Sequence, residues 1–445
     1  MLSEALAVAI ETLSWVELEN LSPKAALHRT VKQLGVTDVE ATRAANRMVF
    51  ETLKRLNLID HFLKTVVDEE RLNQTPLGVK AFLRVYIYET RLSPRRITVP
   101  LTYVKAAREI LGWKAMMPVE EDLGRILNLN ASKPIQNLPE FKKLSLTTYN
   151  TEWFVKYCFR LLGRVQALGF LKSSMMTLPT YLRLNTLRDE EGFLLEQVGR
   201  EGLKLRKVPG LAHVYAVTET KVPIVRTEAY RRGLLSLEDF SSCYAVEVAG
   251  FREGLKVLDV CAAPGVKTSH MAQLMANKGL ICSVDSSRRR GRLWKIEIER
   301  MGVSNGELII ADAQRLLPIG LDADVVFIDP PCTGTGTFAR NPHLKWSLSY
   351  DDVQRFTRVQ WKIIETCANY VKEGGFLIYS TSSITVEENE MLVEKFLKHH
   401  PTFEPVKLDS RIGLPALRGL SMCKRLYPHI NNSNGLFIAK LVKRL

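Results

Sequence analysis

The stretch VLDVCAAPGVKTSHMA, residues 257–272, has the pattern of a buried strand, a tight loop and a helix. Its apolar run ends in a loop of small residues, and spacing typical of a helix follows. Similar short apolar runs end in acids or small residues and are separated by helical stretches: LKVLDV (255–260), GLICSVD (279–285), GELIIAD (306–312), ADVVFID (323–329) and GGFLIYST (374–381). Buried parallel strands that alternate with helices predict a doubly wound α/β sheet over residues 236–445.

The carboxyl ends of these strands predict a ligand site, because ligands bind at that edge of a doubly wound sheet. The ends carry Asp259, Asp285, Asp312 and Asp329. Asp285 follows Gly265 by twenty residues, the spacing at which an acid reaches ribose hydroxyls in nucleotide-binding sheets. GxGxxG is absent, and a valine separates glycine from lysine in GVKT, which disfavours dinucleotide and phosphate-loop sites. A cofactor with one nucleoside and no phosphates, such as S-adenosylmethionine, fits better.

Two further regions precede this sheet. Apolar residues at three- and four-residue spacing predict an all-helical domain over residues 1–125, and a stretch rich in Asn, Ser, Pro and Lys predicts a linker over 126–150. A small mixed α/β module is predicted over 151–235 from one helical pattern and two strand-like runs: TEWFVKYCFRLLGRVQAL (151–168), TYLRLNTL (180–187) and AHVYAV (212–217).

The charge of the 445-residue chain favours a polyanionic partner. Its formal net charge is +14, and basic clusters recur: SPRRI (93–97), KLRK (204–207), YRRG (230–233) and SRRRGR (287–292). No amphipathic basic helix stands out, so nucleic acid is favoured over a membrane. The seven cysteines form no CxxC pair, and no histidine spacing suits zinc, so we predict no metal site and a cytoplasmic location. Acids at Glu4 and Glu11 make the N-terminus a predicted helix and not a signal peptide.

Three motifs in the C-terminal half resemble those of a known enzyme family. VLDVCAAPGVKTSHMA, FIDPPCTGTG (327–336) and YSTSSITVEENE (379–390) resemble the first, fourth and sixth motifs of the RNA (cytosine-5)-methyltransferases, in their Sun/Fmu branch. RLNTLR (183–188) resembles the motif of that family's small RNA-contacting module, and RLYPHINNSNGLFIAKL (425–441) resembles its closing strands. The helical region 1–125 is similar to the NusB-like RNA-binding domain of this branch.

The resemblance implies an activity and a partner. The chain is expected to transfer a methyl group from S-adenosylmethionine to C5 of cytosine in RNA. The NusB-like domain favours ribosomal RNA over transfer RNA by analogy of fold. We expect a monomer that binds no membrane. The alternatives are a transfer RNA methyltransferase, a catalytically silent RNA-binding or assembly factor, and, less favoured by the charge, a methyltransferase for protein or small molecules.

The resemblance also implies roles for individual residues. Cys332 and Ser382 occupy the catalytic positions, Asp329 holds the N3/N4 edge of cytosine, and Lys267 lies near base and cofactor. The implied cofactor-binding residues are Cys261, Ala262, Ala263, Pro264, Gly265, Val266, Lys267, Asp285, Arg290, Asp312 and Asp329. The expected RNA-binding residues are Arg183, Asn185, Arg340 and Lys345, the last two within a basic and aromatic loop, RNPHLKW (340–346).

The sixth motif departs from the family pattern at its nucleophile. The family reads Thr-Cys-Ser there, and that cysteine adds to C6 of cytosine, while the fourth-motif cysteine assists release. This chain reads Thr381-Ser382-Ser383. A serine hydroxyl needs a strong base to attack, and neither motif holds a histidine. Three explanations fit: Cys332 has taken over the attack, the chain binds RNA without methylating it, or Ser382 is an engineered substitution.

The acidic run that follows this motif has a structural interpretation. Thr385 and Glu388, three residues apart, match a capping box at a helix N-terminus. We therefore predict that this run starts a helix and has no catalytic role.

Overall fold

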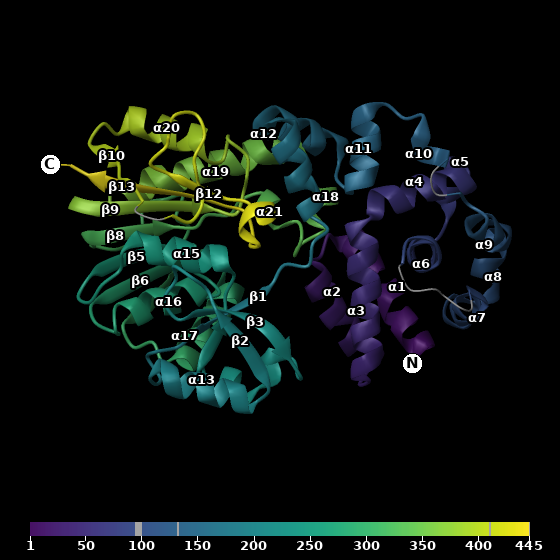
Figure 1. Cartoon of the computed structure of the whole chain (residues 1–445), viewed down its shortest axis with the longest axis horizontal. Coiled ribbons are helices and arrows are strands. Elements are labelled where there is room, and N and C mark those ends of the chain that lie inside the picture. Colours follow the sequence, from purple (N-terminus) through teal and green to yellow (C-terminus); the bar gives the residue numbers. More distant parts are fainter. Residues whose placement is uncertain (94–99, 131–132, 409–410, 445) are drawn as a thin grey trace. The chain divides into compact units, whose positions relative to one another are not determined.

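The chain forms two compact units in the computed structural model, which describes residues 1–93, 100–130, 133–408 and 411–444. The first unit comprises Met1–Met176 with Phe338–Leu348, and the second comprises Thr177–Thr337 with Ser349–Leu445. Figure 1 labels the elements of both units. Most of the basic cluster 93–97 lies outside the described residues. Among the described residues, none of the helices is both long enough and apolar enough to cross a membrane.

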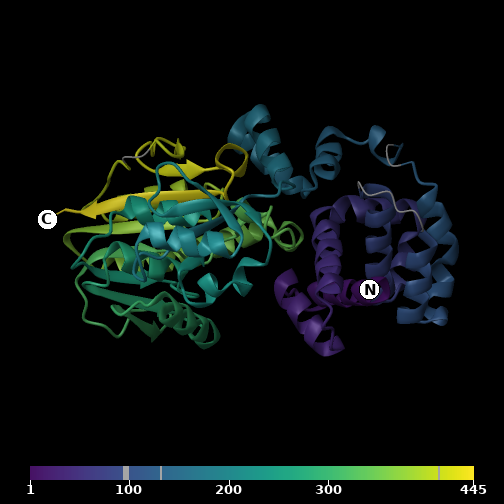
Figure 2. The ribbon, with the colours of Figure 1, turned by 60° about the horizontal axis from the view of Figure 1, so that its bottom comes forward.

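The first unit contains helices and no described strand, as Figures 1 and 2 show. Its α-helices are α1 (Leu2–Glu19), α2 (Pro23–Leu34), α3 (Val39–Lys54), α4 (Leu56–Val66), α5 (Glu69–Gln74), α6 (Leu77–Ile87), α7 (Pro100–Leu111), α8 (Trp113–Met116), α9 (Glu120–Leu127), α10 (Lys133–Gln136), α11 (Glu140–Thr148), α12 (Glu152–Ser173) and α18 (Leu344–Ser347). Three start at side-chain caps, where Ser22 accepts from Ala25 N, Asp38 from Glu40 N and Asp68 from Arg71 N. The helices of this unit pack their apolar faces around one core, which includes Leu6, Phe62 and Phe82. The predicted all-helical character of residues 1–125 is therefore found.

The stretch 126–150 is not an irregular linker. It contains α10 and α11, and the side chain of Asn57 on α4 donates to the carbonyl oxygens of Ser145 (2.8 Å) and Asn150 (3.1 Å). The Asn150 amide in turn donates to Leu171 O on α12. The polar residues that suggested a linker satisfy backbone groups inside the helical unit, and α12 also belongs to this unit.

The short segment Phe338–Leu348 also packs within the helical unit, although it lies far along the sequence. The Phe338 ring lies 5.0 Å from the Phe154 ring, centroid to centroid, and Trp346 Nε1 donates to Leu53 O at 2.6 Å. Lys345 is buried, and its Nζ donates to Tyr149 O at 3.1 Å. The prediction that Lys345 contacts RNA is therefore wrong, because the ammonium group faces the interior of this unit.

The second unit begins with a small module around a four-stranded antiparallel sheet, in the order β2-β3-β1-β4. Its elements are β1 (Thr180–Leu184), α13 (Glu191–Arg200), β2 (Leu203–Lys207), β3 (Val214–Thr220), α14 (Glu228–Arg231) and β4 (Leu235–Leu237). The two strands predicted in this region are present as β1 and β3, with β1 three residues shorter than predicted. The larger sheet, described next, belongs to the same unit.

The larger sheet has the order β11-β12-β13-β9-β8-β5-β6-β7, and β10 pairs with β13. Its elements are α15 (Phe240–Ala249), β5 (Lys256–Val260), α16 (Val266–Leu274), β6 (Leu280–Asp285), α17 (Arg288–Met301), β7 (Gly306–Ile310), β8 (Ala323–Ile328), α19 (Tyr350–Ala368), β9 (Val371–Thr381), α20 (Glu390–His399), β10 (Phe403–Pro405), β11 (Leu414–Pro415), β12 (Lys424–Leu426), α21 (Pro428–Asn431) and β13 (Leu436–Lys443). Strands β5 to β9 pair in parallel, whereas β13 runs antiparallel to β9. The prediction of a doubly wound α/β sheet is confirmed.

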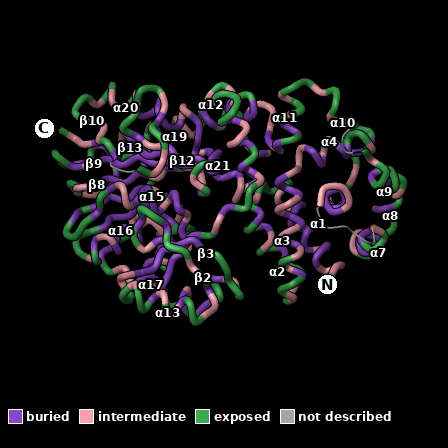
Figure 3. The backbone as a smooth tube through the Cα atoms, viewed as in Figure 1, coloured by how far each residue is buried: buried purple, intermediate pink, exposed green. Residues whose placement is uncertain are grey.

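Helices cover both faces of this sheet, and its central strands are buried (Figures 1 and 3). Successive residues of β8 point to opposite faces: Val325 and Phe327 pack with α15 and α16, whereas Val326 and Ile328 pack with α19 and α20. Burial on both faces explains why the strands read as continuous apolar runs. The carboxyl ends of five neighbouring strands therefore meet at one edge.

The burial of Lys345 provides a test of how the segment 338–348 packs in the helical unit. Burial, with Lys54 and Arg55 nearby, lowers the pKa of Lys345 well below its ordinary value. The unfolded chain then binds one more proton than the folded chain until the pH passes the ordinary lysine pKa, so stability should rise with pH. We expect the unfolding free energy of the parent, relative to Lys345→Met, to increase by up to about 1.4 kcal/mol per pH unit.

Denaturant unfolding at several values between about pH 8 and pH 10 would measure this difference. A difference that does not change with pH would show that Lys345 keeps its proton in the folded unit.

Candidate active site

The loop after β5 presents backbone at the sheet edge. Cys261 lies in the left-handed region at φ 64°, and Gly265 at φ 102° precedes α16. The Gly265 backbone packs against Trp294, where an added Cβ would stand 3.1 Å from the indole ring. This close approach and the positive φ both require glycine. The loop therefore follows a fixed path to the N-terminus of α16, and its predicted residues 261–267 lie at the carboxyl end of β5.

Asp285 is held at the end of β6 by backbone donors. Ala263 N donates to one carboxylate oxygen at 3.2 Å, and Ser287 N donates to the other at 2.9 Å. The Arg290 guanidinium donates to Ala263 O and lies 3.7 Å from the Asp285 carboxylate. Each carboxylate oxygen has a second lone pair, so the fixed group can still accept from the hydroxyls of a ribose. Asp312 follows β7 at the same edge and is exposed.

The centre of this edge is acidic. Lys267 Nζ lies 2.7 Å from Asp329 Oδ2, and Thr268 donates to buried Asp259 at 2.6 Å. Burial raises the pKa of Asp259 to about 7, with Asp329 and Asp285 adding to the rise against Thr268 and Lys267. Burial alone would lower the pKa of Lys267, but the neighbouring carboxylates, chiefly Asp329, raise it.

The edge holds two cationic groups, Lys267 and Arg290, among its three carboxylates, so it offers no excess of positive charge to a ligand with phosphates and suits a nucleoside that carries positive charge. The predicted cofactor residues thus fit a cationic nucleoside such as S-adenosylmethionine.

Cys332 follows β8 in the sequence Asp-Pro-Pro-Cys. The backbone N–H groups of Gly334 and Ser382 lie near its sulfur and act to lower the pKa of the thiol. The pKa of the Cys332 thiol is raised to about 12, chiefly by burial and in addition by Glu388 and Asp329, while the two N–H groups act in the opposite direction. The site thus holds a thiol with donors aimed at the position where a thiolate would form.

Ser382 contributes its backbone to this arrangement. Its N–H acts to lower the pKa of Cys332, and its carbonyl oxygen accepts from Gly336 N at 2.9 Å. The side chain is partly exposed. Among the described residues, no carboxylate or imidazole hydrogen-bonds to the Ser382 hydroxyl. Nothing in the described site therefore activates this serine as a nucleophile.

Glu388 holds the two catalytic loops together. It accepts from Thr333 N (2.9 Å), Thr333 Oγ1 (2.6 Å), Ser383 Oγ (2.5 Å), Thr385 Oγ1 (2.8 Å) and Gln360 Nε2 (2.9 Å). Thr333 adjoins Cys332, and Ser383 adjoins Ser382. The five donors therefore fix the loop that carries the thiol against the loop that supplies one of its N–H partners.

The capping-box interpretation of Thr385 and Glu388 is wrong. The helix α20 starts at Glu390, and residues 386–389 form a turn before it. Thr385 does donate to Glu388, but both are buried in the network around the loops. The rest of the acidic run is also structural, because Glu390 forms a buried ion pair with Arg425, whose Nη1 donates to Ile384 O. Thr385 and Glu388 do have the spacing of a capping box. Glu388, however, also accepts hydrogen bonds from Thr333 and Gln360, which are distant in the sequence, and it does not cap a helix.

Two glycines allow a third loop to approach. Gly336 O accepts from Gly435 N at 2.8 Å, and an added Cβ on Gly336 would lie 2.7 Å from Gly435 Cα and from Ser382 O. Side chains at either position would separate the backbones. The segment before β13 that contains Gly435 therefore packs directly against the loop that carries Cys332.

Arg183 and Asn185 are buried, so the prediction that they contact RNA is wrong. Arg183 Nε pairs with Glu238 at 3.1 Å, and its Nη2 donates to Ser269 Oγ at 2.9 Å. Asn185 donates to Gly233 O and Met301 O, both at 2.8 Å. These side chains join the small module to α16 and α17, and thereby brace the helix that follows the loop 261–265.

A buried group beside Arg183 has the residue types of a metal site. Glu238, Cys243 and His270 offer ligand atoms within 4.8 Å of one another. The Arg183 guanidinium already pairs with the Glu238 carboxylate, and it would repel a cation placed there. We interpret the cluster as an internal ion-pair network.

The structure thus brings most of the predicted site residues to one edge. Loop 261–267, Asp285, Arg290, Asp312, Asp329, Cys332 and Ser382 lie at the carboxyl ends of β5 to β9 or directly after them. Arg183, Asn185 and Lys345 do not belong to a solvent-facing site. Arg340 is partly buried in the first unit, and its contact with RNA stays a prediction. Sequence reasoning gave Glu388, an acid inside the sixth motif, a different role, and it missed Gln360, whose only signal was a polar residue on an apolar helix face.

Comparisons with known proteins agree with this geometry. Residues 248–442 match the family model described as 16S rRNA methyltransferase RsmB/F. A protein of Bacillus subtilis named as probable ribosomal RNA small subunit methyltransferase B is 26% identical, over 98% of this chain and 98% of its own length. The tRNA (cytosine(72)-C(5))-methyltransferase of Pyrococcus horikoshii is 32% identical over 58% of this chain and 66% of that protein. The solved structure of PH0851 superposes with a TM-score of 0.83 at 25% identity, covering 100% of this chain and 99% of that one.

The Glu388 network predicts a specific sensitivity. In Glu388→Gln an amide donor would face Thr333 N–H or the hydroxyl donors, so the variant should lose about 1–3 kcal/mol of unfolding free energy. The matched control is Glu387→Gln, a partly exposed neighbour, which should change it by less than about 0.5 kcal/mol. Chemical denaturation of the three proteins would compare them. Equal stability of both variants would remove Glu388 as the link between the loops.

Proposed function

The chain belongs to the RsmB/F family of RNA cytosine-5 methyltransferases, and we propose that it methylates C5 of a cytosine in ribosomal RNA. The similarity to a relative named for ribosomal RNA extends over 98% of both chains, so it includes the helical unit. The similarity to the relative named for transfer RNA covers only 58% of this chain. Transfer RNA is therefore the second candidate. A monomeric state and a cytoplasmic location stay predictions.

The proposed methyl donor is S-adenosylmethionine, which supplies an electrophilic methyl group on a positively charged sulfonium. Asp285 would accept the ribose hydroxyls, and the backbone of residues 261–265 would border the nucleoside. Asp285 and Asp329 provide the negative charge that suits a cationic ligand, whereas Asp259, with its raised pKa, contributes less. One observation supports this assignment: Ala263 N and Ser287 N each donate to one oxygen of the Asp285 carboxylate. A carboxylate that is already held in place binds a diol with little loss of side-chain conformational entropy.

We further propose that Cys332 is the nucleophile. Its thiolate adds to C6 of cytosine, and the electron pair of the C5–C6 double bond becomes available at C5 for methylation. The methyl group would pass to C5 and leave S-adenosylhomocysteine, and loss of the C5 proton to a base would then restore the double bond as the carbon–sulfur bond breaks and the thiolate is released. The N–H groups of Gly334 and Ser382 would stabilise the thiolate before attack and after release. Asp329 would hold the N3/N4 edge of the base, with Lys267 beside it.

Single-residue variants separate this proposal from the alternatives. Cys332→Ala should abolish methylation, and Ser382→Ala should retain most of it, because the Ser382 backbone and not its hydroxyl reaches the thiol. Ser382→Cys should raise the rate if serine has replaced a cysteine at this position, in evolution or by engineering. The reason is that a thiolate forms far more easily than an alkoxide. Transfer of labelled methyl groups to ribosomal RNA lacking this modification is the measurement.

Full activity of Cys332→Ala would exclude the attack by Cys332. A parent and a Ser382→Cys variant that both bind cofactor and RNA, and both fail to methylate, would favour an RNA-binding factor.

Cofactor binding can be tested without RNA. Replacing Asp285 by Ala should weaken S-adenosylmethionine binding by about 1–3 kcal/mol, the range for hydrogen bonds to a charged group. Asp312→Ala is the matched control at the same edge, because Asp312 is exposed and follows the outer strand β7; its effect should be smaller. Isothermal calorimetry would give both affinities. Unchanged affinity in Asp285→Ala would remove Asp285 from the cofactor site.

A further inference from the structure

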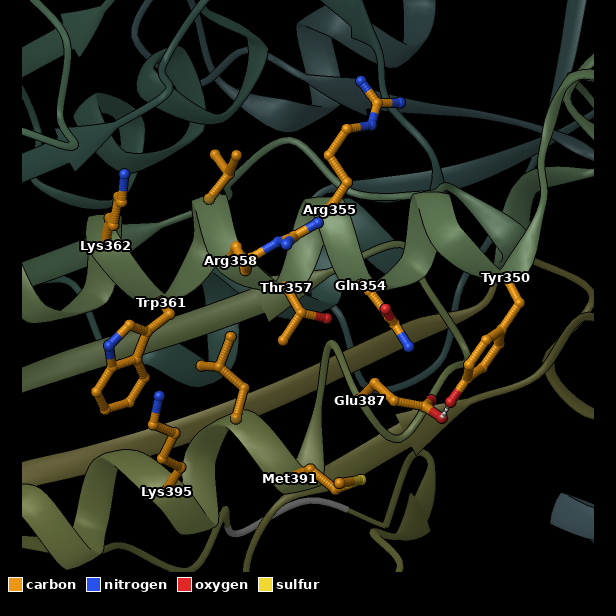
Figure 4. Close-up of a pocket in the computed structure, with 12 residues that line it drawn as sticks. Tyr350, Gln354, Arg355, Thr357, Arg358, Trp361, Lys362, Glu387, Met391 and Lys395 are labelled. Atoms are coloured by element: carbon orange, nitrogen blue, oxygen red, sulfur yellow. Dashed lines mark hydrogen bonds between the residues drawn. The ribbon is translucent and has the colours of Figure 1, made fainter.

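A groove of about 810 Å³ lies between α19 and α20 in the second unit (Figure 4). Its walls carry four cationic side chains, Arg355, Arg358, Lys362 and Lys395. Apolar atoms of Trp361, Met391 and their neighbours form much of the remaining surface. The groove is separate from the residues that line the edge beside Asp285.

One end of this groove adjoins the catalytic loops. Tyr350 starts α19, and its hydroxyl donates to Glu387 Oε1 at 2.9 Å across the groove (Figure 4). Glu387 is bonded to Glu388, whose carboxylate holds Thr333 next to Cys332. The helices α19 and α20 begin after β8 and β9, so this end of the groove lies at the same sheet edge as the loops that carry Cys332 and Ser382.

The cations in the groove are available for a polyanion. Arg358, Lys362 and Lys395 are exposed, and none of them forms an ion pair with a carboxylate among the described residues. Lys395 Nζ lies 3.7 Å from the centroid of the Trp361 ring, which fixes its ammonium group at the wall. Arg355 differs, because it pairs with Asp352 at 2.7 Å. The groove thus has three cations without carboxylate partners beside an apolar surface. A single strand of nucleic acid would place its phosphates against the cations and its bases against the apolar surface.

We propose that this groove binds single-stranded RNA next to the target cytosine. The inference rests on the proposed function, since it assumes that RNA reaches Cys332. From Tyr350 to Lys362 the helix α19 extends about 18 Å, the length of about five phosphates in a stacked strand. The phosphates contact Arg358, Lys362 and Lys395, and bases lie on the apolar floor. An acidic peptide would match the charges, but only a nucleic acid has to continue into the loop that carries Cys332.

The test compares two variants that each remove three positive charges. The groove variant combines Arg358→Gln, Lys362→Gln and Lys395→Gln. The control combines Arg252→Gln, Lys278→Gln and Lys372→Gln, which lie at the amino ends of the strands, away from the catalytic edge. Fluorescence anisotropy with a short single-stranded RNA, between about 50 and 200 mM salt, gives affinity and salt dependence. The groove variant should bind roughly tenfold more weakly, and its slope of log K against log salt should fall by about 2, at about 0.7 for each phosphate that the protein no longer neutralises.

The control should bind within about threefold of the parent. Equal losses in the two variants would overturn the proposal, because net charge alone would then explain them. Binding is measured without methyl transfer, so a parent that fails to methylate but shows the groove-specific loss refutes the proposed activity and leaves the groove in place. A parent that methylates RNA while its groove variant binds like the control refutes the groove alone. Photocrosslinks from 4-thiouridine RNA should map to residues 350–362 or 387–395, and crosslinks that map only elsewhere would also overturn it.

Discussion

The carboxylate of Glu388 is the interaction on which the geometry of the catalytic edge depends. Five donors from three separate segments converge on it, and two of these segments carry Cys332 and Ser382. A buried carboxylate without these donors would be costly, so each partner is held in place by the need to satisfy it. The result is that the N–H of Ser382 faces the sulfur of Cys332 while the serine hydroxyl has no activating partner among the described residues.

This arrangement gives the serine at the sixth motif a physical interpretation. The position still performs a backbone function, because its N–H lowers the pKa of Cys332 and its carbonyl accepts from Gly336. A serine in place of a cysteine at this position leaves these backbone interactions unchanged. Burial raises the pKa of the Cys332 thiol in the free protein, so the proposed attack requires that the thiol lose its proton when the base is bound.

The sequence predicted what depends on local pattern and failed where distant partners decide. Continuous apolar runs identified the parallel strands, because both faces of the sheet are covered, and strand-end acids identified the catalytic edge. Arg183 and Lys345 were misassigned to RNA, because a basic residue looks the same in sequence whether it faces solvent or a buried partner. Glu388 was misassigned as a helix cap, because its spacing from Thr385 fits that motif while Thr333 and Gln360, its other partners, are distant in the chain. The boundary of the helical unit was also missed, since Phe338–Leu348 joins it from the C-terminal half.

The most direct test of the account is to identify the atom that attacks the base. RNA that carries a cytosine analogue without a removable C5 proton should form a stable covalent adduct with the protein in the presence of S-adenosylmethionine. The account predicts that protease digestion and mass spectrometry will find the nucleotide attached to the sulfur of Cys332. Attachment at Ser382, or methylation of normal RNA with no adduct at Cys332, would contradict it.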